Sequence, residues 1–138
     1  MGVRMENKIK TKNLKQTAIF KANQKELYQL LMDSKKHAAF SEAEAKISNK
    51  VGGSFTAYDG WIEGKNVKLV PNKLIVQKWR GQDWPKGHYS VATYKLEKKG
   101  TGTKLTFTQT SVPINKFKDI SSGWKTHYWK KMKEYLEE

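Results

Sequence analysis

Hydrophobic and polar positions change their period twice along the chain. Near the amino-terminal end, lysines alternate with Ile9 and Thr11 and the run closes on Ala18–Phe20, which predicts a long first strand over 8–21. Lys15 and Gln16 interrupt this alternation, which indicates a bend or a bulge in the strand at that point.

Two short helices are predicted directly after this strand. Asn23 is a favourable N-cap residue, and Glu26 stands three positions later, as in a capping box. Leucines at helical spacing follow and predict an amphipathic helix over 24–32. Asp33 and Ser34 can cap a second helix that ends near Phe40.

Between Ala43 and Thr110 the period returns to two and predicts six further strands. They are expected at 43–48, 53–58, 61–70, 73–80, 87–97 and 103–110. Glycine, proline, asparagine and aspartate punctuate the boundaries, so the strands are joined by tight turns. Long strands joined by tight turns form an antiparallel meander.

The last segment of the chain has a helical period. Its apolar residues recur at every fourth position, at Ile120, Trp124, Tyr128, Met132 and Leu136. Such a stripe must be covered, and the predicted sheet is the one large surface in the chain that can cover it. We therefore predict an α+β fold: a curved antiparallel sheet of about seven strands around a long C-terminal helix, with two short helices after strand one.

Length and composition narrow the class of protein. A chain of 138 residues suits one domain, which we expect over 8–138 after a disordered leader at 1–7. Aromatic residues make up 12% of the chain, which is typical of a globular domain and not of a basic tail. There is no cysteine to form a disulfide and no apolar run long enough for a signal or a membrane span, so we expect a cytoplasmic protein.

The net charge of +14 first suggests nucleic-acid binding, but two features disfavour it. Arginine is the usual residue for bidentate contacts with bases and phosphates, yet only Arg4 and Arg80 are arginines among the 27 basic residues. The lysines are spread over nearly every predicted element instead of one stripe. Lysines on every element more often indicate a solvated surface than a groove that binds nucleic acid.

Catalytic and metal-binding motifs are not recognisable in this sequence. His37, His88 and His127 lie in different predicted elements, and none has a partner at metal-ligand spacing. A nucleophile elbow and a phosphate-binding loop are also missing from the sequence. We expect a binding protein without a metal or cofactor, and not an enzyme.

A sheet that curves over a helix can leave an apolar cavity between the two. The residues that could line such a cavity are Phe55, Trp61, Val76, Trp79, Tyr94, Phe107, Trp124 and Tyr128. The alternative is that these large side chains fill the core and leave little or no space.

The segment Trp79–Tyr89 places two tryptophans around a turn. Trp84 stands in the turn between Arg80 and Lys86, and His88 follows, which is typical of an interface anchor with a basic rim. These four residues are our candidates for contact with a partner. In the alternative interpretation, Trp84 folds back over the edge of the sheet.

The motifs Lys78-Trp79-Arg80 and Trp84-Pro85-Lys86-Gly87-His88 resemble the C-terminal domain of activators of the heat shock protein 90 ATPase. Similar pieces at Gly52–Phe55, Val112-Pro113 and Gly123–Tyr128 extend the resemblance over about residues 8–135. This domain type is part of the START-like superfamily (SRPBCC, Bet v 1-like), whose helix-grip fold agrees with the predicted order of elements.

The resemblance implies a co-chaperone-like protein that binds a chaperone of the heat shock protein 90 type and modulates its ATPase. It covers only the second of the two domains of the full-length activators. The superfamily also implies an alternative, a binding or carrier protein for an apolar small molecule. We expect a monomer in either case, because the predicted meander with its covering helix needs no second chain.

Overall fold

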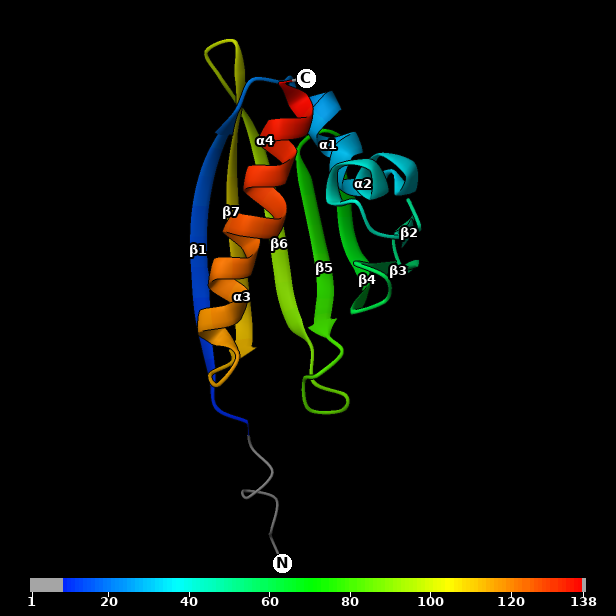
Figure 1. The fold of residues 1–138 in the computed structure, drawn as a ribbon, viewed down its shortest axis with the longest axis vertical. Coiled ribbons are helices and arrows are strands. Elements are labelled where there is room, and N and C mark those ends of the chain that lie inside the picture. The colour runs from blue at the N-terminus through cyan, green and yellow to red at the C-terminus, as the bar shows by residue number, and fades with distance from the viewer. Residues whose placement is uncertain (1–8, 138) are drawn as a thin grey trace, which may run out of the picture.

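A computed structural model describes residues 9–137 and shows one sheet with a long helix lying across it (Figure 1). Seven antiparallel strands form the sheet in the order β1-β7-β6-β5-β4-β3-β2. The strands are β1 (Thr11–Phe20), β2 (Lys46–Ile47), β3 (Ser54–Ala57), β4 (Ile62–Val70), β5 (Leu74–Gly81), β6 (Ser90–Lys99) and β7 (Gly102–Pro113). The predicted α+β helix-grip fold is confirmed, while the predicted leader at 1–7 lies outside the described residues.

The two short helices follow β1 as predicted; the first contacts β6 and β7, and the second lies over the β2–β4 side of the sheet (Figure 1). They are α1 (Gln24–Met32) and α2 (Ser34–Ser41). The Asn23 side chain accepts a hydrogen bond from the Glu26 backbone at 2.8 Å, and the Glu26 carboxylate accepts one from the Asn23 backbone at 3.3 Å. This capping box fixes the start of α1, and Asp33 caps α2 by accepting from the backbone of Lys36.

The pairing of β1 with β7 is irregular, at an earlier position of β1 than the sequence predicted. The register shifts between Lys12 and Leu14, where Asn13 of β1 stands opposite two residues of β7, Thr110 and Ser111, so the extra residue of the bulge lies in β7. The Asn13 side chain accepts a hydrogen bond from the backbone of Ser111, which stabilises the bulge. The predicted interruption at Lys15 and Gln16 is wrong, because both residues keep regular pairing with β7.

Several strand boundaries differ from the prediction for local reasons. The strand expected at 43–48 shrinks to two residues, because Glu42 ends α2 in a left-handed conformation and the chain turns after it. The strand expected at 87–97 begins at Ser90, because the preceding residues fold into a turn in which the backbone of His88 donates to the Pro85 carbonyl. Strand β7 runs to Pro113, past the predicted end at Thr110.

The C-terminal helix is continuous but contains a wider turn. It consists of α3 (Phe117–Gly123), the π-helical segment η2 (Trp124–Trp129) and α4 (Lys130–Leu136). The predicted stripe is confirmed, since Ile120, Trp124, Tyr128 and Met132 are buried and Leu136 packs against the core. The π segment adds one aromatic residue that the four-residue spacing missed: Trp129 is also buried, and its indole N–H donates to the Gln16 side chain at 2.7 Å.

Candidate functional site

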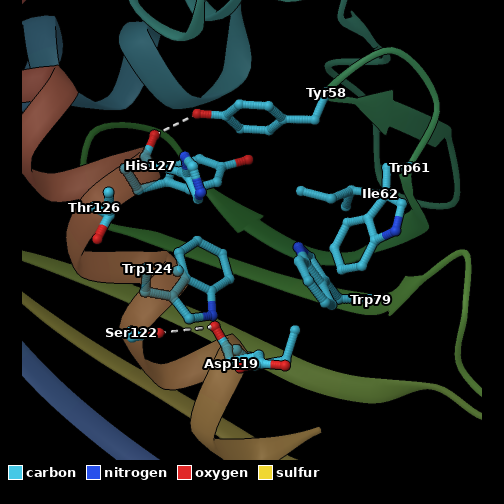
Figure 2. A pocket seen from close by; sticks show the side chains of 12 residues that line it. Tyr58, Trp61, Ile62, Trp79, Asp119, Ser122, Trp124, Thr126 and His127 are labelled. Atoms are coloured by element: carbon cyan, nitrogen blue, oxygen red, sulfur yellow. Dashed lines mark hydrogen bonds between the residues drawn. The ribbon is translucent and has the colours of Figure 1, made fainter.

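An open cavity of about 430 Å³ lies between the C-terminal helix and strands β4 and β5 (Figure 2). The helix supplies one wall with residues of α3 and η2, between Asp119 and Tyr128. The sheet supplies Ile62 and Trp79, and the turn between β3 and β4 supplies Tyr58 and Trp61. The cavity therefore depends on three parts of the chain that are distant in sequence.

Aromatic rings form most of the cavity wall. Trp61 meets Trp79 edge-on with ring centroids 6.3 Å apart. Trp79 lies 5.5 Å from Trp124, which lies 4.5 Å from Tyr128. Trp79 and Trp124 are almost fully buried and fixed by their neighbours, so this wall is rigid, whereas half-buried Trp61 stands at its open side.

Tyr58 is held over one end of the cavity by an unusual turn. Its φ of 51° is in the left-handed region, which bulky side chains rarely adopt, and Asp59 and Gly60 follow with φ of 58° and 89°. The Tyr58 hydroxyl donates a hydrogen bond to the backbone carbonyl of His127 in the π segment (Figure 2). The turn at Tyr58–Gly60 and the π segment of the helix thus meet at the mouth of the cavity.

A histidine supports the inner wall from behind. His37 of α2 is 3% exposed, and its Nε2 lies 2.9 Å from the Tyr128 hydroxyl. Burial lowers the pKa of His37 to about 4, so the ring is neutral at pH 7, and burial raises the pKa of Tyr128 far above its usual value. Among the described residues, the Nδ1 of His37 has no hydrogen-bond partner.

The structure brings together four of the eight residues proposed for a cavity: Trp61, Trp79, Trp124 and Tyr128. Phe55, Tyr94 and Phe107 instead belong to the closed core and do not line this cavity. Val76 lies on the opposite face of the sheet, because buried Ile75 and Gln77 on either side of it point toward the helix.

The sequence interpretation missed several lining residues for a common reason. Tyr58 belongs to a turn, and Asp119, Thr126 and His127 stand beside the apolar stripe of the helix and not within it. A search for buried positions omits such rim residues, because their side chains are exposed or half-buried. The only signal for Tyr58 was its position before Asp59-Gly60, a typical turn sequence.

The four partner-contact candidates lie close together, but not as a free loop tip. Trp84 is 4% exposed and packs on Trp79 with centroids 5.4 Å apart, so it folds back over the sheet. Arg80 pairs with Glu63 at 3.0 Å and donates to the carbonyl of Trp84, which ties the turn to β5. The expectation of an exposed tryptophan anchor is wrong, because this indole has a buried surface to cover.

The other two candidates differ from Trp84 in exposure. The His88 ring is half-buried, and its Nε2 lies 2.8 Å from the carbonyl of Ser111. Lys86 is exposed at the end of the turn. Of the four side chains, Lys86 is therefore the one that projects freely into solvent.

Sequence comparison identifies the family. The protein-family model described as "Activator of Hsp90 ATPase homolog 1-like protein" matches residues 21–137. The chain belongs to this family. Membership in the Hsp90 ATPase activator homolog family confirms the resemblance found in the sequence, which rested on the strand and loop motifs between β3 and the C-terminal helix.

Curated relatives of this family carry the activator name. The activator of 90 kDa heat shock protein ATPase homolog of Dictyostelium discoideum is 33% identical over 124 residues, which is 89% of this chain and 32% of that protein. Homolog 1 of Homo sapiens is 32% identical over 121 residues, or 88% of this chain and 35% of that protein. The chain thus spans about a third of the length of these relatives.

Solved structures of other proteins share the fold. A crystal structure of an HSP90 activator from Plasmodium falciparum has a TM-score of 0.84 at 24% identity, covering 90% of this chain and 95% of that chain. A Chromobacterium violaceum protein reaches a TM-score of 0.75 at 20% identity, covering 91% and 97%. Within residues 9–137, no helix is long and apolar enough to cross a membrane.

Proposed function

We propose that this chain binds a chaperone of the 90-kDa heat shock class and thereby modulates its ATPase, acting as a docking protein and not as an enzyme. The family and the names of its curated relatives support this partner. Because the match covers about a third of those relatives, the proposal concerns binding through this one domain.

The observation that carries the proposal is the charge on the outer face of the sheet, the face away from the C-terminal helix. Strand register and burial place on it the lysines Lys15, Lys46, Lys65, Lys68, Lys78, Lys95 and Lys104. Its carboxylates Glu63 and Glu97 are each paired with a basic neighbour, Arg80 and Lys95. The remaining positive charge is complementary to an acidic protein surface.

One pair of strands shows that this charge is costly for the fold. Lys65 of β4 stands directly opposite Lys78 of β5, and both side chains are exposed. Like charges at directly opposed positions of an antiparallel pair are destabilising. The two lysines destabilise the fold and lie in the middle of the basic face. Their presence therefore supports a role of this face in binding.

Lys78→Glu separates stability from binding. The new carboxylate faces Lys65, so we expect the free energy of unfolding to rise by roughly 0.2–1 kcal/mol, measured by urea denaturation. We expect affinity for the chaperone to fall about tenfold at low salt, because the change reverses a charge at the interface. A titration of the chaperone, with its ATPase rate as a second readout, measures the affinity.

The matched control is Lys130→Glu, which changes the net charge equally but lies exposed on α4. We expect this variant to bind like the parent protein. Equal losses in both variants would show that only the total charge matters and would refute the sheet face as the docking surface. Failure of the parent protein to bind at low salt would refute the chaperone proposal itself.

The cavity beside the C-terminal helix favours a second candidate function, the binding of a small apolar molecule. Its volume of about 430 Å³ is within the range of ligand sites, and aromatic and aliphatic side chains form most of its wall. This candidate is independent of the outer face, because the cavity opens on the helix side of the sheet (Figure 2).

Filling the cavity tests this candidate. A Cβ atom built at Gly123 meets only the His127 ring, at 3.8 Å, so Gly123→Leu should fold and extend its side chain toward the cavity. We expect the parent protein to bind 1-naphthylmethanol in calorimetric titration and the variant to bind it about tenfold more weakly. Lys118→Leu, exposed on the same helix and outside the lining, is the control. Equal binding by all three proteins would contradict a ligand site here.

A further inference from the structure

The composition of the cavity wall differs from that of the rest of the chain. The chain has 27 lysines and arginines among its 138 residues, but none of the 12 lining residues is a lysine or an arginine, and His127 is the one imidazole among them. An anionic ligand, such as a fatty acid or a phosphate ester, would find no lysine or arginine to balance its charge among these side chains. The wall is therefore unsuited to anions, although the protein as a whole attracts them.

The one carboxylate of the lining belongs to Asp119, which lies at the end of the cavity beside Trp124 and Trp79 (Figure 2). The carboxylate of Glu42, which acts on the lining residue Tyr58, already pairs with Lys131. Asp119 forms no ion pair within residues 9–137. It is thus available to a ligand.

The aromatic rings favour the same sign of charge. Indole and phenol faces carry negative electrostatic potential, which attracts ammonium groups within about 6 Å of the ring centroid. Trp61, Trp79 and Trp124 form a continuous row along the cavity, and Tyr58 lies across from this row (Figure 2). A flat ring can pack against these faces while its amine reaches Asp119.

We propose that this cavity binds small aromatic amines in their protonated form, with the aromatic part against the row of tryptophans and the ammonium group beside Asp119. This inference rests on the second candidate function, the binding of a small molecule, and adds the class of ligand. The net charge of +14 does not prevent it, because at physiological ionic strength charges more than about 8 Å away are largely screened.

Three probes that share one ring and differ in charge test the inference: 1-naphthylmethylamine, 1-naphthylmethanol and 1-naphthylacetate. Calorimetry gives their affinities, and the indole N–H signals of the tryptophans in NMR spectra report where they bind. We expect the amine to bind about tenfold more tightly than the alcohol and the acid to bind most weakly. The signals of Trp61 and Trp79 should shift with the amine.

Asp119→Asn removes the carboxylate charge with almost no change of shape. We expect it to abolish the preference for the amine over the alcohol. Glu134→Gln, which changes the net charge equally on exposed α4, should leave the preference intact. A preference that persists in Asp119→Asn, or an alcohol that binds as well as the amine, would overturn the inference while leaving small-molecule binding in place. Absence of binding by all three probes would overturn both.

Discussion

Trp124→Ala is expected to lower the free energy of unfolding by about 3–5 kcal/mol, because it empties the contact between the C-terminal helix and the sheet. Trp124 is 2% exposed, and its ring lies 4.2 Å from Phe107 and 4.5 Å from Tyr128, centroid to centroid. No neighbouring side chain can fill the space that an indole leaves between a rigid sheet and a helix.

Part of this destabilisation comes from the loss of a buried hydrogen bond. The Trp124 indole N–H donates to the Gln109 side chain at 2.7 Å, and the Gln109 amide donates in turn to the hydroxyl of Ser90. Alanine leaves the Gln109 oxygen buried without its donor, which costs about 1–3 kcal/mol in comparable cases. This amount is included in the expected total of about 3–5 kcal/mol and is not added to it, because the lost packing and the lost hydrogen bond occur at one site.

Urea denaturation of Trp124→Ala and Trp124→Phe separates the two contributions. Phenylalanine keeps most of the packing and removes the donor, so we expect it to lose less stability than alanine. The double variant Trp124→Phe with Gln109→Leu should recover part of the loss, because the unpaired oxygen is removed. A midpoint for Trp124→Ala equal to that of the parent protein would contradict the assignment of this residue to the core.

The pattern of the chain predicts most of the fold because its local signals agree with its global arrangement. The capping box of Asn23 and Glu26 defines α1, and alternation between turn residues locates the strands. The predictions are wrong where tertiary contacts, and not the local pattern, determine the structure. Gln16 disrupts the pattern of alternation but pairs regularly, because its side chain bonds to Ser121 and Trp129 of the helix.

The candidate site is less predictable, because it depends on three-dimensional geometry that the hydrophobic periodicity of the sequence does not encode. The four-residue spacing of the helix locates Trp124 and Tyr128, but the π segment turns Trp129 inward as well. Asp119 is a common surface residue by every local criterion, and only the fold brings it to the end of the cavity. The charge on the outer face is similarly invisible until strand register aligns the lysines.

The aromatic residues also explain why the turn after β5 is not a free binding loop. Trp61, Trp84 and Trp124 form one cluster around Trp79, which contacts each of them. Gly81 lies against this cluster, where a Cβ atom would come within 2.6 Å of the Trp61 ring. Close packing at this point requires glycine and holds the turn against the sheet.

Trp84→Ala is therefore expected to destabilise the protein by about 3 kcal/mol, in the lower part of the range for a buried tryptophan, and not to spare the fold. The indole is 4% exposed and contacts Trp79, while its N–H has no partner among the described residues. Trp84→Phe should cost clearly less than alanine, because it removes this unpaired group and retains an aromatic contact.

Thermal and urea denaturation of Trp84→Ala and Lys86→Ala provide the comparison. Lys86 is exposed on the same turn, so its replacement should change the free energy of unfolding by no more than about 0.5 kcal/mol. If Trp84→Ala were as stable as Lys86→Ala, the indole would not be a packing residue. Arg80 donates to the Trp84 carbonyl at 2.7 Å, so loss of the packed turn also changes the position of Arg80. The chaperone affinity of Trp84→Ala is therefore compared with that of a variant of similar stability, such as Trp124→Phe.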